Sequence, residues 1–324
     1  MVPCRQMLRT LIVCSVLTLL AACAAPDAGI QASARGGATG VSGAEPLADV
    51  ASQAAGRMAG LAARLPRHRF VLLGEVHDNA VGHALRHAAL EQALASGWRP
   101  ALAMEQFDRE NQALLDQALR RCHDAACVID AAAPQRKGWN WAYYEPIVSL
   151  ALKYHLPVVA ANLSRQDAAR IMRQGLASVF SPEELGRLGL STDIEPALLK
   201  AQETQVEQAH CDMLPPGMSR GMALAQIARD ATLALAMRTE MNRGPGQAPV
   251  VLLAGNGHVD KHVAVPYWLE KASFRSTEES GVFAVGFVEQ PATGGSYDEQ
   301  VRLPPADRPD PCEAFLRQRS EPQS

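Results

Sequence analysis

The sequence predicts an α/β fold with a mainly parallel sheet flanked by helices. Four apolar segments, FVLLG, ALAME, PVVAAN and VVLLAG, lack the alternation of polar and apolar residues that a half-exposed strand shows. Unbroken apolar runs are typical of parallel strands that are covered on both faces. Segments with apolar residues at helical spacing separate these runs, and strands that alternate with helices indicate parallel crossover connections.

The first half of the domain contains helices and strands in alternation. Their expected bounds are 48–65 (helix), 69–75 (strand), 79–97 (helix), 99–106 (strand) and 108–122 (helix). We expect Asp78 or Asn79 to cap the second helix and Asp108 to cap the third, because short polar side chains accept hydrogen bonds from free N–H groups at helix starts. Gly97 suits the end of the second helix.

The second half begins with a loop that carries two cysteines, followed by a helix from about Glu145 with Pro146 in its first turn. A strand is expected at 156–163, and Ser164 can cap the next helix. Residues from about 165 to 245 show no convincing strand and predict a helical insertion, in which Ser181 is an N-cap. Strands return at 248–258 and 282–290, and a proline-rich tail follows.

The amino terminus has the features of an export signal. Arg5 and Arg9 precede the apolar stretch LIVCSVLTLL, which is too short to span a bilayer as a helix. The sequence LAAC ending at Cys23 resembles a bacterial lipobox, in which the cysteine becomes the lipidated first residue. An ordinary signal peptide with an incidental cysteine is the alternative. Alanine after Cys23 favours the outer membrane, with the protein facing the periplasm.

These features give four expected parts of the chain. We expect a lipoprotein signal peptide at 1–22, a lipidated cysteine and flexible tether at 23–47, an α/β domain at 48–302 and a tail at 303–324. The tether is predicted from its alanine, glycine and serine content, which lacks any periodicity. Membrane attachment is therefore expected through the lipid alone.

Composition and charge narrow the class of partner. Hydrophobic residues make up 48% of the chain and charged residues 20%, which is ordinary for a globular protein. The formal net charge of −3 gives no broad basic field, so we do not expect a nucleic acid partner.

Seven cysteines are present, of which two leave with the signal and one carries lipid. The four that remain are Cys122, Cys127, Cys211 and Cys312. An even number in an exported protein suggests disulfides, and three connectivities are possible. One of them joins Cys122 to Cys127 and leaves Cys211 with Cys312. A zinc site is the weaker interpretation, because no second ligand pair has the usual spacing.

Chemically useful side chains follow the apolar strands directly. Ligands of parallel α/β sheets bind outside the carboxyl ends of the strands. These positions hold Glu75, His77, Glu105, Asn162, Asn256 and His258. If the strands are neighbours, the set suits a divalent metal, a general acid–base pair, or both. The alternative is that such residues only cap helices.

Other histidines are weaker candidates. His83 and His87 lie four residues apart on one expected helix face and could act as ligands, although such residues more often line a solvated surface. His262 has the same spacing from His258, and Asp260 is a candidate partner that orients them.

An aromatic cluster, KGWNWAYYEP, stands out in a chain with 5% aromatic residues. It contains Trp139, Trp141, Tyr143 and Tyr144. Trp and Tyr faces can stack on a flat ligand, and a tyrosine phenolate can bind haem iron. A local aromatic core clamped by Pro146 is the structural alternative.

At these residues the chain resembles the ChaN family of haem-binding, iron-regulated lipoproteins. The matching segments are LLGEVHDNAVGH, LAMEQFDRENQ, GWNWAYYEPIV, LPVVAANLSR and VVLLAGNGHVD, in the order of the family. The resemblance implies haem as the cofactor, a role in haem and iron acquisition, and two protomers paired around stacked haems. It also implies a tyrosine iron ligand, with Tyr144 as first choice and Tyr143 as alternate, and His77, His258, Asn162 and Trp141 as further haem contacts. An outer-membrane haem receptor is an expected partner.

The same motifs resemble the wider Tiki and erythromycin-esterase group, in which they form a hydrolytic site. This implies an alternative function as a metal-dependent periplasmic hydrolase. Its catalytic residues would be Glu75, His77, Glu105 and His258, with a divalent metal held by His77, Glu105 and His258. A structural lipoprotein without a ligand is the remaining interpretation.

Overall fold

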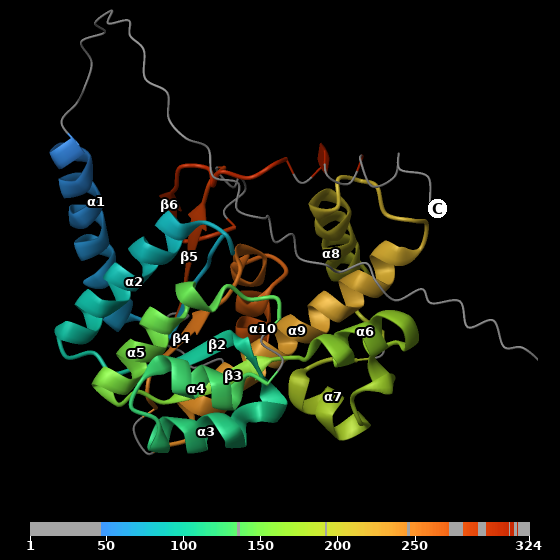
Figure 1. Ribbon diagram of the computed structural model, residues 1–324. Coiled ribbons are helices and arrows are strands. Elements are labelled where there is room, and N and C mark those ends of the chain that lie inside the picture. Colours follow the sequence, from blue (N-terminus) through green and yellow to red (C-terminus); the bar gives the residue numbers. More distant parts are fainter. Residues whose placement is uncertain are drawn as a thin grey trace, which may run out of the picture. The chain divides into compact units, whose positions relative to one another are not determined.

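The structure is a computed structural model that describes residues 47–134, 137–191, 193–244, 247–271, 281–290, 296–310, 312, 313 and 316. The predicted signal peptide, Cys23 and nearly all of the tether lie outside these residues. The described chain builds one sheet with helices against both faces (Figure 1).

The sheet has six strands in the order β3-β2-β4-β1-β5-β6, and every neighbouring pair is parallel. Their bounds are β1 Phe70–Leu73, β2 Ala101–Asp108, β3 Val158–Asn162, β4 Val250–Leu253, β5 Val282–Val288 and β6 Glu299–Arg302. The predicted α/β fold with a mainly parallel sheet is confirmed. Strand β4, which is late in the sequence, lies between β2 and β1 at the centre.

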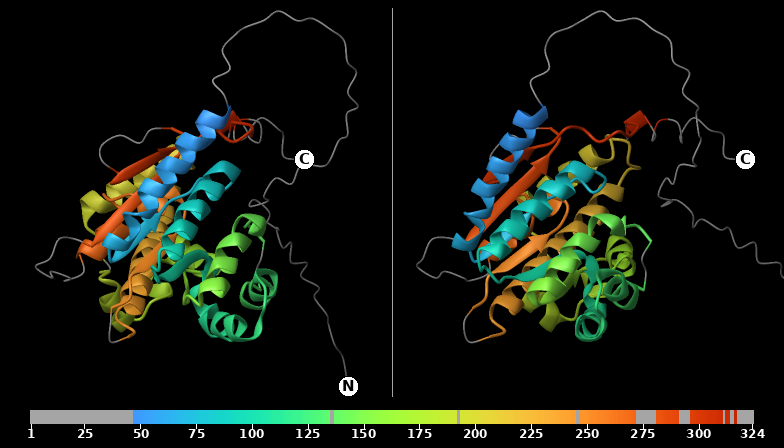
Figure 2. Two further views of the ribbon diagram at one scale, coloured as in Figure 1. Left: turned by 90° about the vertical axis from the view of Figure 1, so that its left-hand side faces the viewer. Right: turned by 60° about the vertical axis from the view of Figure 1, so that its left-hand side comes forward.

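Two sets of helices cover the two faces. The first set is α1 Leu47–Ala62, α2 Ala80–Ala95, α3 Gln112–Arg121, α4 Ala125–Ala132 and α5 Glu145–Tyr154. The second set is α6 Arg165–Gln174, α7 Pro182–Leu188, α8 Pro196–Ala209, α9 Met218–Met241 and α10 Val265–Lys271. Figure 2 shows α1 and α2 side by side along the sheet. The second set contains the whole predicted helical insertion.

The apolar strands explain this three-layer arrangement. Successive residues of a strand point to opposite faces. Val71 and Leu73 of β1 accordingly join the core under the first helix set, while Phe70 and Leu72 join the core under the second. All four are buried, so a strand without polar residues is what this position requires.

Three of the predicted helix caps are present. The side chains of Asn79, Ser164 and Ser181 accept hydrogen bonds from the backbone N–H groups of Gly82, Asp167 and Glu184 at 2.9, 3.2 and 3.2 Å. The predicted cap Asp108 is wrong, because its side chain makes no capping hydrogen bond and β2 continues through it. A 3₁₀ turn at Arg109–Asn111 separates β2 from α3 instead.

Helices α4 and α10 and strand β6 were absent from the sequence prediction. Helix α4 occupies the segment that was expected to be a loop, and the side chain of Asp124 caps it through the N–H of Cys127 at 2.8 Å. Strand β6, with the sequence EQVR, was not expected because it is polar and short. It pairs only with β5 and lies at the edge of the sheet, where polar side chains reach solvent.

Disulfides join Cys122 to Cys127 and Cys211 to Cys312. The prediction of a disulfide framework is confirmed, with the first of the possible connectivities. The short bridge ties the end of α3 to α4, and the long one ties the carboxyl-terminal tail to the segment after α8.

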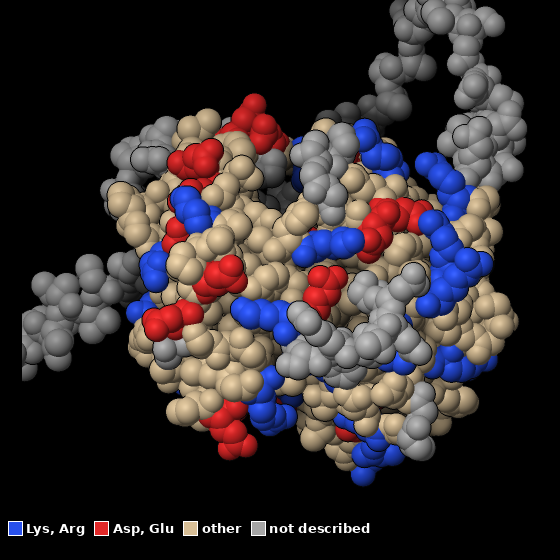
Figure 3. Space-filling model, turned by 180° about the vertical axis from the view of Figure 1, so that it is seen from behind, with Lys and Arg blue, Asp and Glu red and all other residues tan. Residues whose placement is uncertain are grey.

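The described helices include none that is both long and apolar enough to cross a membrane. On the face seen in Figure 3, acidic and basic side chains are interspersed.

Candidate functional site

The site lies where the carboxyl ends of the four strands β3, β2, β4 and β1 meet. Leu253 at the end of β4 is opposite both Leu73 of β1 and Met104 of β2. The next residues along each chain therefore lie at one edge of the sheet. Glu75, Glu105 and the turn Gly255–His258 are brought together in this way, as parallel α/β sheets do with their ligand-binding loops.

Glu75 is the centre of a buried cluster. Its side chain is 1% exposed, and it forms an ion pair with Arg86 of α2, whose side chain is also 1% exposed. Glu75 Oε1 additionally accepts hydrogen bonds from the Tyr144 hydroxyl at 2.6 Å and from His77 Nδ1 at 2.8 Å. Burial alone would raise the pKa of Glu75, but Arg86 and His77 lower it to about 2. The carboxylate is thus charged and fully engaged.

The aromatic residues enclose this cluster. Tyr144 is 1% exposed, and burial followed by the neighbouring Glu75 carboxylate raises the pKa of its phenol far above the ordinary range. Tyr143 is half-buried and stacks on the His83 ring with centroids 4.5 Å apart. Trp141 is buried against Phe107 and Tyr144. Of the aromatic cluster, only Trp139 lines the cavity described below.

A second buried cluster lies on β2, β4 and α9. His258 Nδ1 is 2.6 Å from Asp230 Oδ1, and His258 Nε2 is 3.4 Å from Glu105 Oε1. Burial would lower the pKa of His258, yet the two carboxylates raise it to about 10. Burial also raises the pKa of Asp230 to about 6. At neutral pH the cluster therefore holds an imidazolium ion between two carboxylates.

The two clusters meet at Gly255. Its N–H donates to Glu105 Oε2 at 2.8 Å, and a Cβ on Gly255 would lie 2.8 Å from His77 Nε2. Only a glycine leaves room for His77 and Glu105 at this turn. His77 is the half-exposed member of the set, with 52% of its side chain accessible. Burial lowers the pKa of His77, but hydrogen bonding to Glu75 and the charge of Glu105 raise it overall.

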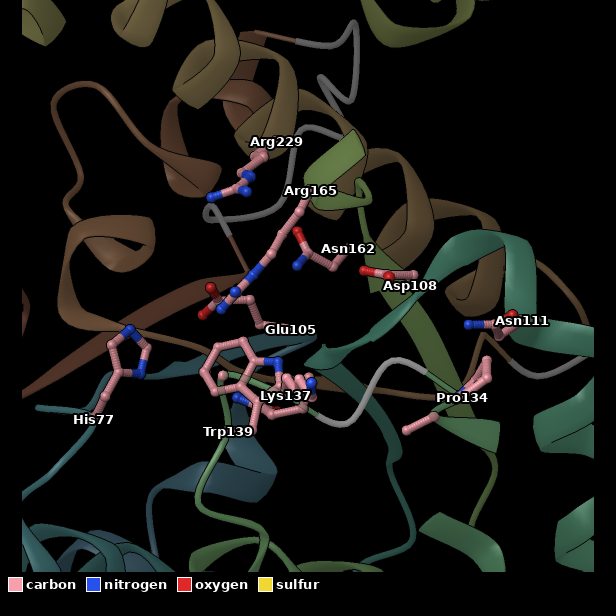
Figure 4. Close-up of a pocket in the computed structure, with 13 residues that line it drawn as sticks. His77, Glu105, Asp108, Asn111, Pro134, Lys137, Trp139, Asn162, Arg165 and Arg229 are labelled. Atoms are coloured by element: carbon pink, nitrogen blue, oxygen red, sulfur yellow. The ribbon is translucent and has the colours of Figure 1, made fainter. Parts of the chain in front are cut away.

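A cavity of about 580 Å³ opens beside these clusters (Figure 4). His77 and Glu105 lie on one side, and Trp139 and Lys137 project from the loop before α5. The far wall is polar and contains Gln106, Asp108, Asn111, Asn162, Arg165 and Arg229. The cavity thus combines an accessible imidazole, an aromatic face and several hydrogen-bonding groups.

An irregularity in β2 shapes this wall. Met104 is opposite Ala160 of β3, but Asp108 is opposite Asn162, so four steps along β2 match two along β3. Extra residues of this kind bend a strand and redirect its side chains. Here they direct Glu105 and Gln106 to the cavity.

The predicted site residues fall into two groups by their position relative to the cavity. His77, Glu105 and Asn162 line the cavity, whereas Glu75, His258 and Tyr144 are buried beside it. The predicted partner Asp260 is wrong for His258, because Asp230 contacts the ring and Asp260 instead accepts from the His262 N–H at 2.8 Å. Within the described residues, no group of three His, Cys, Asp or Glu side chains has the arrangement of a metal site.

Residues 61–269 match the family described as "Haem-binding uptake, Tiki superfamily, ChaN". The chain belongs to this family. The match covers well over half of the sequence and spans every residue of both buried clusters. The resemblance inferred from the motifs is confirmed.

A solved ChaN structure has a similar fold. A ChaN of Campylobacter jejuni with cofacially bound haem is 20% identical, with a TM-score of 0.58 over 74% of this chain and 89% of that one. An erythromycin esterase mutant in its open conformation is 18% identical, with a TM-score of 0.40 over 69% of this chain and 71% of that one. No curated protein matches the chain.

The sequence motifs missed several residues of this ChaN-family site, among them Arg86 on α2, Arg165 on α6, and Arg229 and Asp230 on α9. The last two lie within a helix that has no strand-end signature. An aspartate among apolar residues, at a position that is completely buried in the structure, is the only signal that the sequence offered.

Proposed function

We propose that this protein binds haem as part of haem or iron acquisition. Membership of the ChaN family over residues 61–269 is the observation that carries the proposal. The side chains around the cavity fit a ferric porphyrin. Trp139 offers an aromatic face and His77 a half-exposed imidazole at the cavity, while the half-buried Tyr143 lies outside the lining, against His83. Histidine and tyrosine are both side chains that haem iron accepts as axial ligands. Bound haem would supply the iron that is transferred.

The proposed iron ligand is a tyrosine of the pair Tyr143 and Tyr144, at an interface between two protomers. Tyr144 would bind as phenolate only after its hydroxyl leaves Glu75, since burial and that carboxylate raise its pKa. Tyr143 has no such restraint on its oxygen and is already half-buried rather than enclosed. Iron binding by Tyr143 therefore requires a smaller rearrangement than iron binding by Tyr144, whose hydroxyl must first leave Glu75.

Hemin titration of the mature protein tests this proposal. Binding should produce a shifted Soret band, and replacement of the ligand tyrosine by phenylalanine should weaken affinity and change the spin-state bands. Tyr143→Phe and Tyr144→Phe are compared with Tyr154→Phe, a tyrosine that packs on Arg99 away from the cavity. The absence of a Soret change in the wild type would contradict haem binding. Unchanged spectra in the variant that combines Tyr143→Phe and Tyr144→Phe would contradict a tyrosine ligand.

Anchoring in the outer membrane through Cys23 is the second part of the proposal. The lipobox LAAC and the alanine after it support this placement, which faces the periplasm and gives access to an outer-membrane haem receptor. Metabolic labelling with palmitate should mark the wild type and leave Cys23→Ser unlabelled. Recovery of label in the variant would contradict lipidation at Cys23.

A hydrolase remains the second candidate, on one specific observation. His77 presents a half-exposed imidazole to the cavity while Glu75 holds its Nδ1 at 2.8 Å. A histidine oriented by a carboxylate can serve as a general base. Chromogenic ester and peptide substrates, with metal analysis in parallel, test this function.

The matched histidine variants separate the possibilities. His77→Asn should abolish any hydrolysis, whereas His87→Asn changes a partly buried histidine of α2 that does not line the cavity. Hydrolysis that survives His77→Asn, or its absence in metal-replete wild type, rules out this site as the catalyst.

A further inference from the structure

The polar wall of the cavity contains buried amides without partners. Gln106 is 4% exposed, and neither its Oε1 nor its Nε2 has a hydrogen-bond partner in the described structure. Asn162 is 6% exposed, and its Oδ1 also lacks a partner there. Buried polar atoms without partners are costly and uncommon in native proteins. Both side chains line the cavity, so a polar occupant of the cavity can satisfy them.

The same wall holds two arginines that form no ion pair with a described residue. Arg165 is the first residue of α6 and Arg229 lies on α9, and both extend into the cavity from the side opposite Trp139 (Figure 4). Neither forms an ion pair or hydrogen bond with any residue that the structure describes. Arg229 Nε is moreover a buried donor without a partner.

The nearby carboxylates neutralise these arginines only in part. Glu105 is already bound by His258 and by the Gly255 N–H. Asp108 faces the cavity and interacts electrostatically with both arginines, although it is not within ion-pair distance of either guanidinium. Lys137 adds a third cation to the lining. The cavity therefore has an excess of positive charge, in a place where amides can complete a hydrogen-bonded shell.

The loop opposite is shaped around Arg165. Gly138 has φ +109°, and a Cβ at this position would collide with the Arg165 guanidinium. A left-handed glycine is thus needed where the loop passes against the arginine. The loop therefore lies directly against the Arg165 guanidinium, which remains exposed at the cavity.

We propose that this wall is a binding subsite for an oxyanion, a carboxylate or phosphate group of a small ligand, held by Arg165 and Arg229. Guanidinium groups bind both oxyanions through paired N–H donors. Gln106 and Asn162 hydrogen-bond polar atoms next to the anion. The carboxylates of haem and an independent small anion are the two sources of this chemistry.

Titration with inorganic phosphate and with succinate tests the subsite without haem. Calorimetry and thermal shift at low ionic strength should show saturable binding to the mature wild-type protein. Arg229→Gln and Arg165→Gln should each weaken the affinity at least about tenfold, because each removes a charge-assisted contact. The matched controls Arg220→Gln on α9 and Arg173→Gln on α6 remove the same charge from exposed positions outside the cavity.

The controls decide the outcome. Weaker binding in the two cavity variants and unchanged binding in the two controls supports the subsite. No saturable binding of either anion to the wild type overturns it, and so does an equal loss in the control variants. Arg165→Gln is informative even if Arg229→Gln disturbs the adjacent Asp230, because Arg165 is on another helix.

A second comparison identifies the source of the anion. Hemin and its dimethyl ester differ only in the two carboxylates. If Arg229→Gln weakens hemin binding but not that of the ester, the haem carboxylates occupy the subsite. If the variant weakens phosphate binding and leaves hemin binding unchanged, the ligand is a separate small anion. Because the phosphate titration needs no haem, its result stands whether or not haem binding is observed.

Discussion

Replacing Glu75 by glutamine should remove about 3 to 5 kcal/mol from the free energy of unfolding. The change keeps the size of the side chain but leaves the Arg86 guanidinium, which is 1% exposed, without its counterion. The pKa of Glu75 leads to a similar value. The pKa of Glu75 is lowered from 4.5 to about 2, which corresponds to roughly 3 kcal/mol at 1.36 kcal/mol per pH unit.

The sign of the pH dependence follows from the same value. Because the folded pKa is below the ordinary one, this stabilisation is complete above pH 4.5 and is lost as the pH falls towards 2. Urea denaturation followed by circular dichroism, with the disulfides intact, measures the effect. Glu75→Gln combined with Arg86→Met removes both charges and should recover much of the loss.

The control for this experiment is Glu91→Gln, which breaks an exposed pair with Lys153 and should leave stability unchanged. The reasoning is refuted if Glu75→Gln is no more destabilising than this control. It is also refuted if the double variant loses as much stability as the sum of the two single variants. Either result would indicate that Glu75 contributes little to stability and would favour a chemical role for its carboxylate.

Three further predictions concern the turn after β4, its histidine and the tail. Gly255→Ala should displace His77 and lower its raised pKa in an NMR titration, whereas Gly257→Ala, whose Cβ would have nothing within 4 Å, should not; an unchanged His77 titration refutes the steric argument. Because the pKa of His258 is raised to about 10, its stabilisation is complete below pH 6.5 and is lost as the pH rises through 10. Melting temperatures of the wild type should therefore fall more steeply between pH 7 and 10 than those of His258→Gln, and parallel curves contradict this. Replacing both Cys211 and Cys312 by serine removes a bridge across a sequence separation of 101. The free energy of unfolding in urea should fall by about 2 to 4 kcal/mol, and a fall below about 1 kcal/mol would contradict this prediction.

Much of the fold could be predicted from the sequence, because the local signals for strands and helix caps agree with the pattern of burial. The strands at Phe70 and Val250 are apolar on both faces, and the caps Asn79 and Ser181 precede helices with the expected spacing. The edge strand Glu299–Arg302 could not be predicted, because its mainly polar residues lack the apolar pattern of a buried strand. It is a strand because β5 offers an unpaired edge.

The candidate site was predictable only in part, for a related reason. Side chains that directly follow strands must gather at one edge of a parallel sheet, so Glu75, His77, Glu105 and His258 could be grouped in advance. Asp230 could not, because it approaches His258 from a helix that crosses the sheet. The extra residues in β2 before Asp108 were equally hidden, since register is set between strands and not within one.

The central position of β4 has a consequence for how this protein is made. Glu105 and Gly255, which are hydrogen-bonded across the site, are separated by 150 residues. Until Val250–Leu253 emerges, β2 and β1 have no strand between them and each presents an open edge. A chain that stops short of β4 would leave one edge of β2 unpaired and both edges of β1, because β5 also comes later, and such a chain would be prone to aggregation. Closure of the sheet must therefore come late in synthesis and slowly, as contacts of such long sequence separation demand.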